Sequence, residues 1–365
     1  MLRRPGSPSP WRPRCCHDGH AALDINRHTR SWLVADACAR ADSGSLCYAQ
    51  APTLIHAIPH SAGTPLEINS EVVTTPPRPA ATVVMLRDAD AGMQVFLQRR
   101  HSLSDVLGGA YVFPGGKVDA QDAELDMETR LDRSAADLHA SLHEHALDTV
   151  TAASLYVAAV REVFEESGVL FARDATPWQL QQAQALLRDG CGFGAMLGQL
   201  ALRLQTHSLV PWSRWITPRV PTVTNKRFDT RFFVSEVPVG QTARHDNHEA
   251  TESVWLTPSD ALGRYWADEI ELAPPQIMSL AHLSRYQRVA DVLSEARGRR
   301  PPVVAPQPFD YQGLRAICYP GDQLHRVRER ALPGPTRLVY RNRRFEPVEG
   351  FDALFADAAP PRTEP

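Results

Sequence analysis

A short acidic segment, residues 158–169 with the sequence AAVREVFEESGV, carries the residue types best suited to chemistry in this chain. If the segment is helical, Glu162, Glu165 and Glu166 fall within an arc of about 100°, opposite an apolar face. Carboxylates at these spacings repel one another by a few tenths of a kcal/mol per pair, and a bound divalent cation removes that cost. Oxygen ligands favour Mg²⁺ or Mn²⁺. Arg161, four residues before Glu165, can orient that carboxylate.

The alternative interpretation is a solvent-exposed helix that is acidic and binds no ligand. An upstream glycine loop, residues 113–117 with the sequence FPGGK, favours a site instead. A glycine backbone can approach a phosphate closely, and its carbonyl oxygens can bind a metal ion. Gly168 directly follows the predicted helix, where a left-handed residue commonly ends one.

The charge balance argues against a nucleic-acid-binding protein and leaves a small anionic ligand open. With 39 Lys and Arg, 42 Asp and Glu and a net charge of −3, the chain lacks the strongly basic domain of a nucleic-acid-binding protein. Lysine occurs only at Lys117 and Lys226, and all other residues of this group are arginine. Both lysines lie in candidate site segments, where a compact ammonium group suits contact with phosphate.

The acidic segment and the glycine loop together resemble the Nudix box. That motif is a glycine, five residues, Glu, seven residues and then R-E-U-x-E-E-x-G-U, where U is aliphatic. The run REVFEESGV, residues 161–169, matches every fixed position of its second half. Asp122 stands where the first Glu is expected, and 38 residues separate it from Arg161 where the motif has seven. This insert of 31 residues is similar to the interruption in a Nudix subgroup related to peroxisomal coenzyme A diphosphatases.

Other segments resemble the same subgroup over roughly residues 80–300. The spacing of the coenzyme A pyrophosphatase signature, R-[SA]-x3-R-x3-G-x3-F-P-G-G, is kept from Arg100 through Gly109 to residues 113–116. His101 and Asp105 replace the Ser or Ala and the second Arg of that signature.

The resemblance implies a Nudix α/β/α sandwich with a mixed sheet, an insert within the box and a mostly helical C-terminal extension. It implies hydrolysis of a diphosphate linkage in a nucleoside diphosphate derivative. The leading substrate is coenzyme A or acyl-coenzyme A, cut to 3′,5′-ADP and a 4′-phosphopantetheine species, and ADP-ribose and NADH are the rival substrates. A different class of function is a catalytically silent Nudix domain that binds a nucleotide to regulate another process.

The resemblance also assigns expected roles to individual residues. Arg161 orients the carboxylates, and Glu162 is the first choice for the general base that takes a proton from the attacking water, with Glu249 and Glu252 as alternatives. The expected ligands of Mg²⁺ or Mn²⁺ are Gly116, Glu162, Glu165 and Glu166. The expected substrate contacts are Arg100, Gly115, Gly116, Lys117, Lys226 and Arg227.

Proline content divides the chain into three parts that must position these residues. Of the 30 prolines, ten lie in residues 1–79 and eleven in residues 298–365. We therefore expect a disordered N-terminal extension (1–78), a Nudix domain (79–300, with the insert at about 123–153) and a C-terminal extension with a loose tail (301–365).

Periodicity predicts the elements of the folded middle part. We expect a hairpin over residues 80–99, a helix over 153–167 and further helices over 177–188, 193–205, 258–266 and 275–297. Strands are expected near 212–217, 230–237 and 253–256, and beyond the domain near 314–319 and 337–341.

The same features set expectations for partners and location. The apolar stripe of the helix predicted over 275–297 would pack on the domain or on a second copy in a homodimer. No run approaches the 18 to 20 apolar residues of a membrane-spanning helix, so we expect no membrane partner. Six cysteines without a C-x-x-C pair suit a reducing compartment, and the cytoplasm is the expected location.

Overall fold

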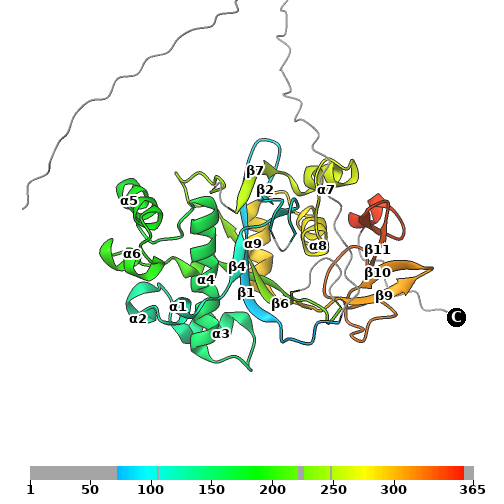
Figure 1. The fold of residues 1–365 in the computed structure, drawn as a ribbon, viewed down its shortest axis with the longest axis horizontal. Coiled ribbons are helices and arrows are strands. Elements are labelled where there is room, and N and C mark those ends of the chain that lie inside the picture. Colours follow the sequence, from blue (N-terminus) through cyan, green and yellow to red (C-terminus); the bar gives the residue numbers. More distant parts are fainter. Residues whose placement is uncertain (1–71, 105–106, 221–225, 247–248, 357–365) are drawn as a thin grey trace, which may run out of the picture. The chain divides into compact units, whose positions relative to one another are not determined.

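The strands predicted for the middle of the chain form one mixed sheet (Figure 1). A computed structural model describes residues 72–104, 107–220, 226–246 and 249–356, all within one unit, residues 59–365. The N-terminal extension predicted over 1–78 lies outside the described residues except for 72–78, so its disorder stays a prediction.

The sheet has the order β3-β2-β1-β6-β5-β8, with β4 paired to β1 and β7 to β2. β1 and β2 form the predicted antiparallel hairpin, whereas β1 and β6 run parallel, with Val83 opposite Phe233. The eight strands are β1 (Arg78–Arg87), β2 (Gln94–Arg100), β3 (Tyr111–Val112), β4 (Gly115–Lys117), β5 (Val210–Ile216), β6 (Phe228–Glu236), β7 (Ala250–Leu256) and β8 (Val303–Val304).

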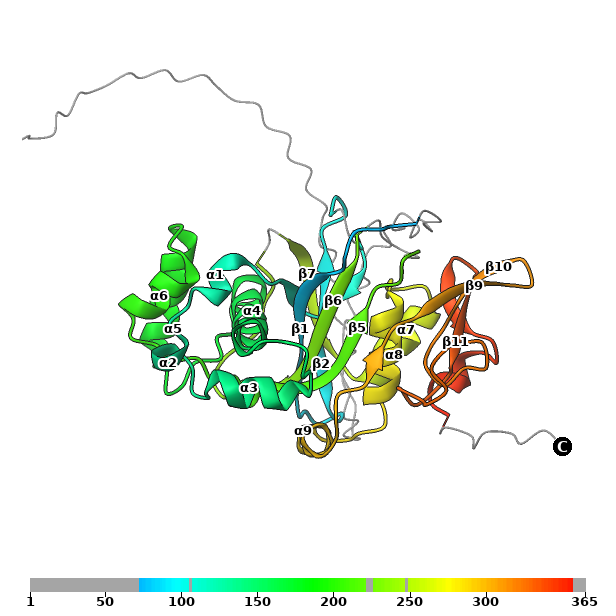
Figure 2. The ribbon, with the colours of Figure 1, turned by 90° about the horizontal axis from the view of Figure 1, so that it is seen from below.

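Helices cover both faces of this sheet, as the expected sandwich requires (Figure 2). Side chains of a strand alternate between the two faces, so Val83 and Met85 pack on one hydrophobic cluster and Val84 and Leu86 on the other. The first cluster includes helix α4 (Thr149–Ser167). The second includes α7 (Pro258–Trp266), α8 (Pro274–Leu283) and α9 (Val289–Gly298). The predicted α/β/α layering is therefore confirmed.

Helix α4 carries the acidic segment and begins four residues before the predicted start. Asp148 precedes its first residue, and the Asp148 side chain accepts a hydrogen bond from Thr151 N at 2.8 Å, as an N-cap does. Gly168 ends the helix with a φ of 71°, which confirms the predicted stop.

The insert is a set of short helices that pack beside α4. Helix α1 (Ala120–Ala123) lies at the start of the insert, and α2 (Met127–Arg130) and α3 (Ala135–Leu142) lie within it. After α3, the Glu144 carboxylate accepts hydrogen bonds from Arg231 at 2.5 and 2.9 Å and lies 2.8 Å from a guanidinium nitrogen of Arg214. The insert is thus tied to β5 and β6. Beyond α4, the chain forms α5 (Pro177–Arg188), α6 (Phe193–Gln199) and the 3-10 turn η1 (Thr206–Ser208).

The single helix predicted over 275–297 is wrong, because the chain breaks it into α8 and α9. The N-terminus of α9 meets the turn between β1 and β2, where Asp88 Oδ1 accepts a hydrogen bond from Val289 N at 2.9 Å. This acceptor comes from 201 residues away in sequence, so helical periodicity could not reveal it.

The expectation of a mostly helical C-terminal extension is also wrong. Within residues 301–356, the described chain forms an antiparallel sheet of β9 (Gln307–Tyr311), β10 (Leu314–Cys318), β11 (Arg337–Arg341) and β12 (Arg344–Pro347), and its helical content is the 3-10 turn η2 (Phe351–Leu354). Two-residue turns with positive φ join both hairpins, at 312–313 and 342–343, and this geometry matches the twist of antiparallel strands. The strands predicted near 314–319 and 337–341 are confirmed.

No described helix is both long and apolar enough to span a membrane.

The contact between Asp88 and α9 predicts a stability effect. Asp88→Ala removes an acceptor for a helix N-terminal N–H group and should lower the free energy of unfolding by about 1 kcal/mol, measured by urea denaturation. Asp90→Ala is the matched control, because Asp90 lies in the same turn and has no side-chain hydrogen bond to any described residue. Equal effects of the two substitutions would contradict the assignment.

Candidate active site

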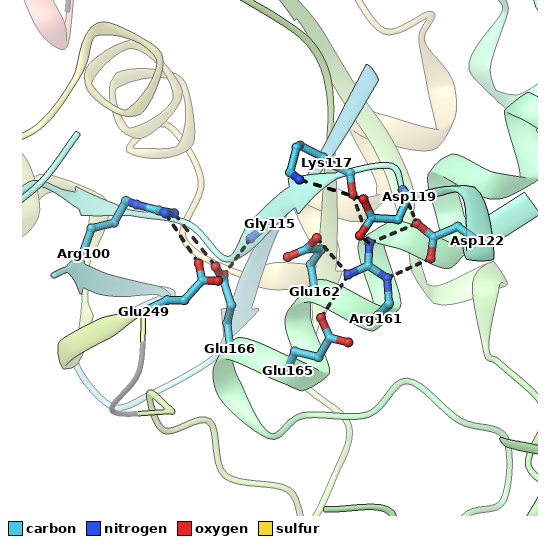
Figure 3. Close-up of polar contacts among 10 residues, drawn as sticks. All are labelled: Arg100, Gly115, Lys117, Asp119, Asp122, Arg161, Glu162, Glu165, Glu166 and Glu249. Atoms are coloured by element: carbon cyan, nitrogen blue, oxygen red, sulfur yellow. Dashed lines mark hydrogen bonds and ion pairs between the residues drawn. The ribbon is translucent and has the colours of Figure 1, made fainter. Parts of the chain in front are cut away.

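The acidic face of α4 meets the glycine loop at one end of the sheet (Figure 3). Glu162, Glu165 and Glu166 project from consecutive turns of α4, whose apolar side packs on the sheet. β4, which contains Gly115 and Gly116, pairs with β1 beside this helix end. In the sequence, 44 residues that include the insert separate the glycine loop from Glu162, and the fold brings the two segments into contact.

Arg161 lies at the centre of the polar contacts. Its guanidinium donates two hydrogen bonds to the Asp122 carboxylate, at 2.8 and 3.0 Å, and one to the Lys117 carbonyl at 3.0 Å. It donates further hydrogen bonds to Glu162 at 2.9 Å and Glu165 at 3.0 Å. Arg161 is therefore placed where it could orient both glutamates, and the orienting role stays a prediction. Because Arg161 and Asp122 are 3 % and 1 % exposed, their paired geometry is held in the protein interior.

Burial and mutual repulsion make the carboxylates harder to ionise. Burial is the largest cause that raises the pKa of Glu162 to about 7 and of Glu166 to about 8. The pKa of Glu165 is also raised, again chiefly by burial. Burial alone would lower the pKa of Arg161, but Asp122, Glu162 and Glu165 together raise it. A cation beside these carboxylates would favour their ionised forms.

The two loop glycines lie against the glutamates. Gly115 N donates to Glu166 Oε2 at 2.9 Å. A Cβ atom added to Gly116 would lie 2.4 to 2.5 Å from the carboxyl atoms of Glu162, far inside normal contact distance. This close approach of backbone and carboxylate is what a glycine permits, and it agrees with the expected joint role of Gly116 and Glu162.

A cleft of about 850 Å³ opens over these residues. Most of the predicted catalytic and binding residues line it, on strands, loops and α4: Arg100, Gly115, Gly116, Lys117, Arg161, Glu162, Glu165, Lys226 and Glu249. The lining also includes apolar side chains, Leu103, Leu107, Val112, Phe113 and Phe228. Arg100 lies 3.5 Å from Glu249 and 4.0 Å from Glu166, at the side of the cleft away from Lys117 (Figure 3).

Three residues considered from the sequence are not among those that line the cleft. Glu166 adjoins it, because its Oε2 accepts from the N–H of the lining residue Gly115. Arg227 does not line the cleft, because its guanidinium donates to the carbonyls of residues 75, 217 and 218. Glu252 is also absent from the lining and hydrogen-bonds the side chain of Tyr111.

Sequence reasoning missed Gln98, Asp119 and Arg78. Gln98 Nε2 donates to Glu166 Oε2 at 2.5 Å, and Asp119 lies 3.6 Å from Arg161. Arg78 lines the cleft and is paired in register with Phe228, two residues after Lys226. Gln98 had a detectable signal, since it is a polar residue within the apolar strand segment VFLQ. Arg78 is the first residue of β1 and Asp119 is the N-cap of α1, and charged residues are common at both kinds of position.

The donor set of the site fits a hard divalent cation. Glu162, Glu165 and Glu166 supply carboxylate oxygens, and Gly116 supplies a carbonyl. Among the described residues, no three acidic, His or Cys side chains already converge as a metal-binding group. Arg161 holds one oxygen each of Glu162 and Glu165, so the other oxygen of each carboxylate is left for a ligand.

Comparison with known proteins gives the same family from different evidence. A family model described as the NUDT19 Nudix domain matches residues 50–283. The Caenorhabditis elegans protein named "Putative nudix hydrolase 7" is 28% identical over 278 residues, 74% of this chain and 82% of that protein.

Proteins named "Acyl-coenzyme A diphosphatase NUDT19" are also similar. The Xenopus laevis protein is 25% identical over 54% of this chain, and the human protein is 26% identical over 63%. The matches span 62% and 68% of those two proteins. A solved structure of a NUDIX hydrolase from Alicyclobacillus acidocaldarius aligns with a TM-score of 0.49 at 27% identity, over 63% of this chain and 99% of that chain.

The buried pair of Arg161 and Asp122 predicts a stability difference between two neighbouring aspartates. Asp122→Asn removes the charge that faces a buried guanidinium and should cost about 3 kcal/mol of unfolding free energy. Asp119→Asn, whose side chain is 45 % exposed at 3.6 Å from Arg161, should cost less than about 1 kcal/mol. Urea denaturation of both variants measures the difference, and similar losses would refute the central role of Asp122.

Proposed function

The chain belongs to the Nudix hydrolase family, and from that premise we propose that it hydrolyses a diphosphate linkage in a nucleoside diphosphate derivative with Mg²⁺ or Mn²⁺. The observation that carries this proposal is the cleft in which the carboxylates of α4, a backbone loop of two glycines and cationic side chains lie together. Diphosphate hydrolysis needs these three elements, because negative charge must be bound and a water molecule must be deprotonated.

The proposed metal ligands are Glu162, Glu165, Glu166 and the Gly116 carbonyl. A bound divalent cation would neutralise charge that develops on the phosphoryl oxygens. Arg161 holds Glu162 and Glu165 by one oxygen each, which restricts the rotation of both side chains. Asp122 in turn fixes Arg161, so Asp122 is a positioning residue in this scheme.

Glu162 is the proposed general base. Its Oε1 accepts from Arg161 Nη1 at 2.9 Å, so Oε2 is the oxygen that either binds the metal ion or takes a proton from a water molecule in the cleft, and the two roles exclude each other. Glu249 is the second candidate, because it also lines the cleft, 3.5 Å from Arg100. Glu252 is the weakest of the three, since it does not line the cleft.

Coenzyme A or acyl-coenzyme A is the leading substrate. Three findings support it: the spacing from Arg100 to the glycine loop, the names of the NUDT19 relatives, and the composition of the cleft. Lys117, Lys226 and Arg78 come from strand ends that the sheet register places together, and they suit the phosphates of the nucleotide. Leu103 and Leu107 suit a less polar pantetheine or acyl chain.

ADP-ribose and NADH are the rival substrates within the same reaction class, because they too contain a diphosphate joined to adenosine. A silent nucleotide-binding domain is the alternative outside enzymology. The intact carboxylate set argues against it, since a protein that binds nucleotide alone gains no stability from three neighbouring carboxylates that repel one another, two of them largely buried.

A substrate panel tests the proposed activity. The wild-type protein, with Mn²⁺ or Mg²⁺, is incubated with coenzyme A, acetyl-coenzyme A, NADH and ADP-ribose, and products are identified by mass. We expect 3′,5′-ADP from the coenzyme A compounds, no turnover after chelation with EDTA, and a loss of at least a hundredfold in kcat for Glu165→Gln. Nucleotide binding without turnover of any compound would favour the silent domain, and an active Glu165→Gln enzyme would refute the metal site.

The Lys226 side chain gives a test of substrate contact. Lys226→Ala should raise KM by about tenfold, because it removes one charge-assisted contact with phosphate, and should change kcat much less. Arg219→Ala is the control for net charge, since Arg219 is exposed and does not line the cleft. A KM unchanged in Lys226→Ala, or raised equally in both variants, would remove Lys226 from the binding site.

A further inference from the structure

We propose that Gln98 is a positioning residue that holds Glu166 so that a single oxygen, Oε1, is presented to the metal ion. This inference rests on the proposed function, because it takes Glu166 to be a metal ligand.

Two donors from different strands fix the other oxygen of Glu166. Gln98 Nε2, from β2, donates to Oε2 at 2.5 Å, and Gly115 N, from β4, donates to the same atom at 2.9 Å. β2 and β4 are not paired with each other, since β4 pairs with β1. The Glu166 side chain therefore spans two strands, and Oε1 is the oxygen left with no hydrogen bond from these donors.

The burial of Gln98 lowers the stability of the fold, so stability does not explain this residue. The residue is 1 % exposed, and its Oε1 atom has no hydrogen-bond partner among the described residues. A buried polar atom without a partner destabilises a fold. Phe96, two residues earlier on the same face of β2, is apolar and fully buried. An apolar residue at position 98 would carry no unpaired buried oxygen, so the amide of Gln98 points to a role in the site.

The neutral amide is also the appropriate chemical type. An amide N–H donor orients a carboxylate without cancelling its charge. A lysine or arginine at this position would form an ion pair with Glu166 and repel a divalent cation. Arg100, two residues later on β2, has its Nη1 4.0 Å from Glu166 Oε1, which is beyond hydrogen-bond distance, and its Nη2 3.5 Å from Glu249. Oε1 therefore faces a guanidinium but is not hydrogen-bonded to it. Partners of this kind, which touch a ligand and not the metal, commonly change metal affinity by ten- to a hundredfold.

Binding of Mn²⁺, followed by the electron paramagnetic resonance signal of the free ion, tests the inference without any turnover. Gln98→Met keeps the size of the side chain and removes the donor. We expect its Kd for Mn²⁺ to rise about tenfold or more. In a Glu166→Gln background, the same substitution should change the Kd by less than about twofold, because Gln98 acts through Glu166.

Phe96→Leu is the matched control for packing. It alters the same strand and the same buried face without touching the site, so it should lower the melting temperature and leave the Kd for Mn²⁺ unchanged. Three results would overturn the inference. The Kd for Mn²⁺ could be unchanged in Gln98→Met, or Gln98→Met could raise the Kd equally in the wild-type and the Glu166→Gln proteins. Phe96→Leu could also raise the Kd as much as Gln98→Met does.

The outcomes also separate this inference from the proposed function. If the wild-type protein binds Mn²⁺ but hydrolyses no compound of the panel, the proposed activity is wrong. The Mn²⁺ affinities of the Gln98 and Glu166 variants still decide the role of Gln98. If the wild-type protein binds no Mn²⁺, the metal site and the role of Gln98 are both overturned.

Discussion

The geometry of the candidate site depends on the buried contact between Arg161 and Asp122. Arg161 belongs to α4, Asp122 to the short helix after the glycine loop, and Lys117, whose carbonyl Arg161 also contacts, to β4. One guanidinium thus joins the helix that carries the carboxylates to the strand that carries the glycines. Both charges are buried away from water, so the loss of either partner would leave an unpaired buried charge and destabilise the site.

The sheet adds a second constraint from the other side of the site. β1 and β2 pair near the hairpin turn, but β4 pairs with β1 and β3 with β2 farther along. The two short strands therefore occupy the region where the hairpin strands diverge. Glu166 reaches into this region from α4 and bonds to β2 and β4. The helix is fixed at two points, through Arg161 and through Glu166, and the cleft lies between them.

Much of this site could be predicted from the sequence, because its strongest signals are local. The helix with its terminal glycine, the glycine loop and the two lysines each lie in a short segment. Gln98 stands out as a polar residue in an apolar strand, but its role, like the break before Val289, could not be found in this way, since each depends on a partner distant in sequence, Glu166 and Asp88. The sequence also did not reveal that the C-terminal extension is mainly a β-sheet. Its strands are short, and the turn at 342–343 lacks the Asn-Gly pair that identifies such hairpins.

The anchoring of Glu144 has a consequence for how the chain folds. The loop between Asp122 and Arg161 is about five times longer than the loop of seven residues in the uninterrupted motif. The entropy cost of closing a loop grows only with the logarithm of its length. The additional cost is therefore about 1.5 kcal/mol. The ion pairs that Glu144 makes with Arg214 and Arg231, and the packing of α3 on α4, can offset a cost of this size. The motif can therefore accept a long insertion at this point, provided that the inserted chain folds back on the body of the domain.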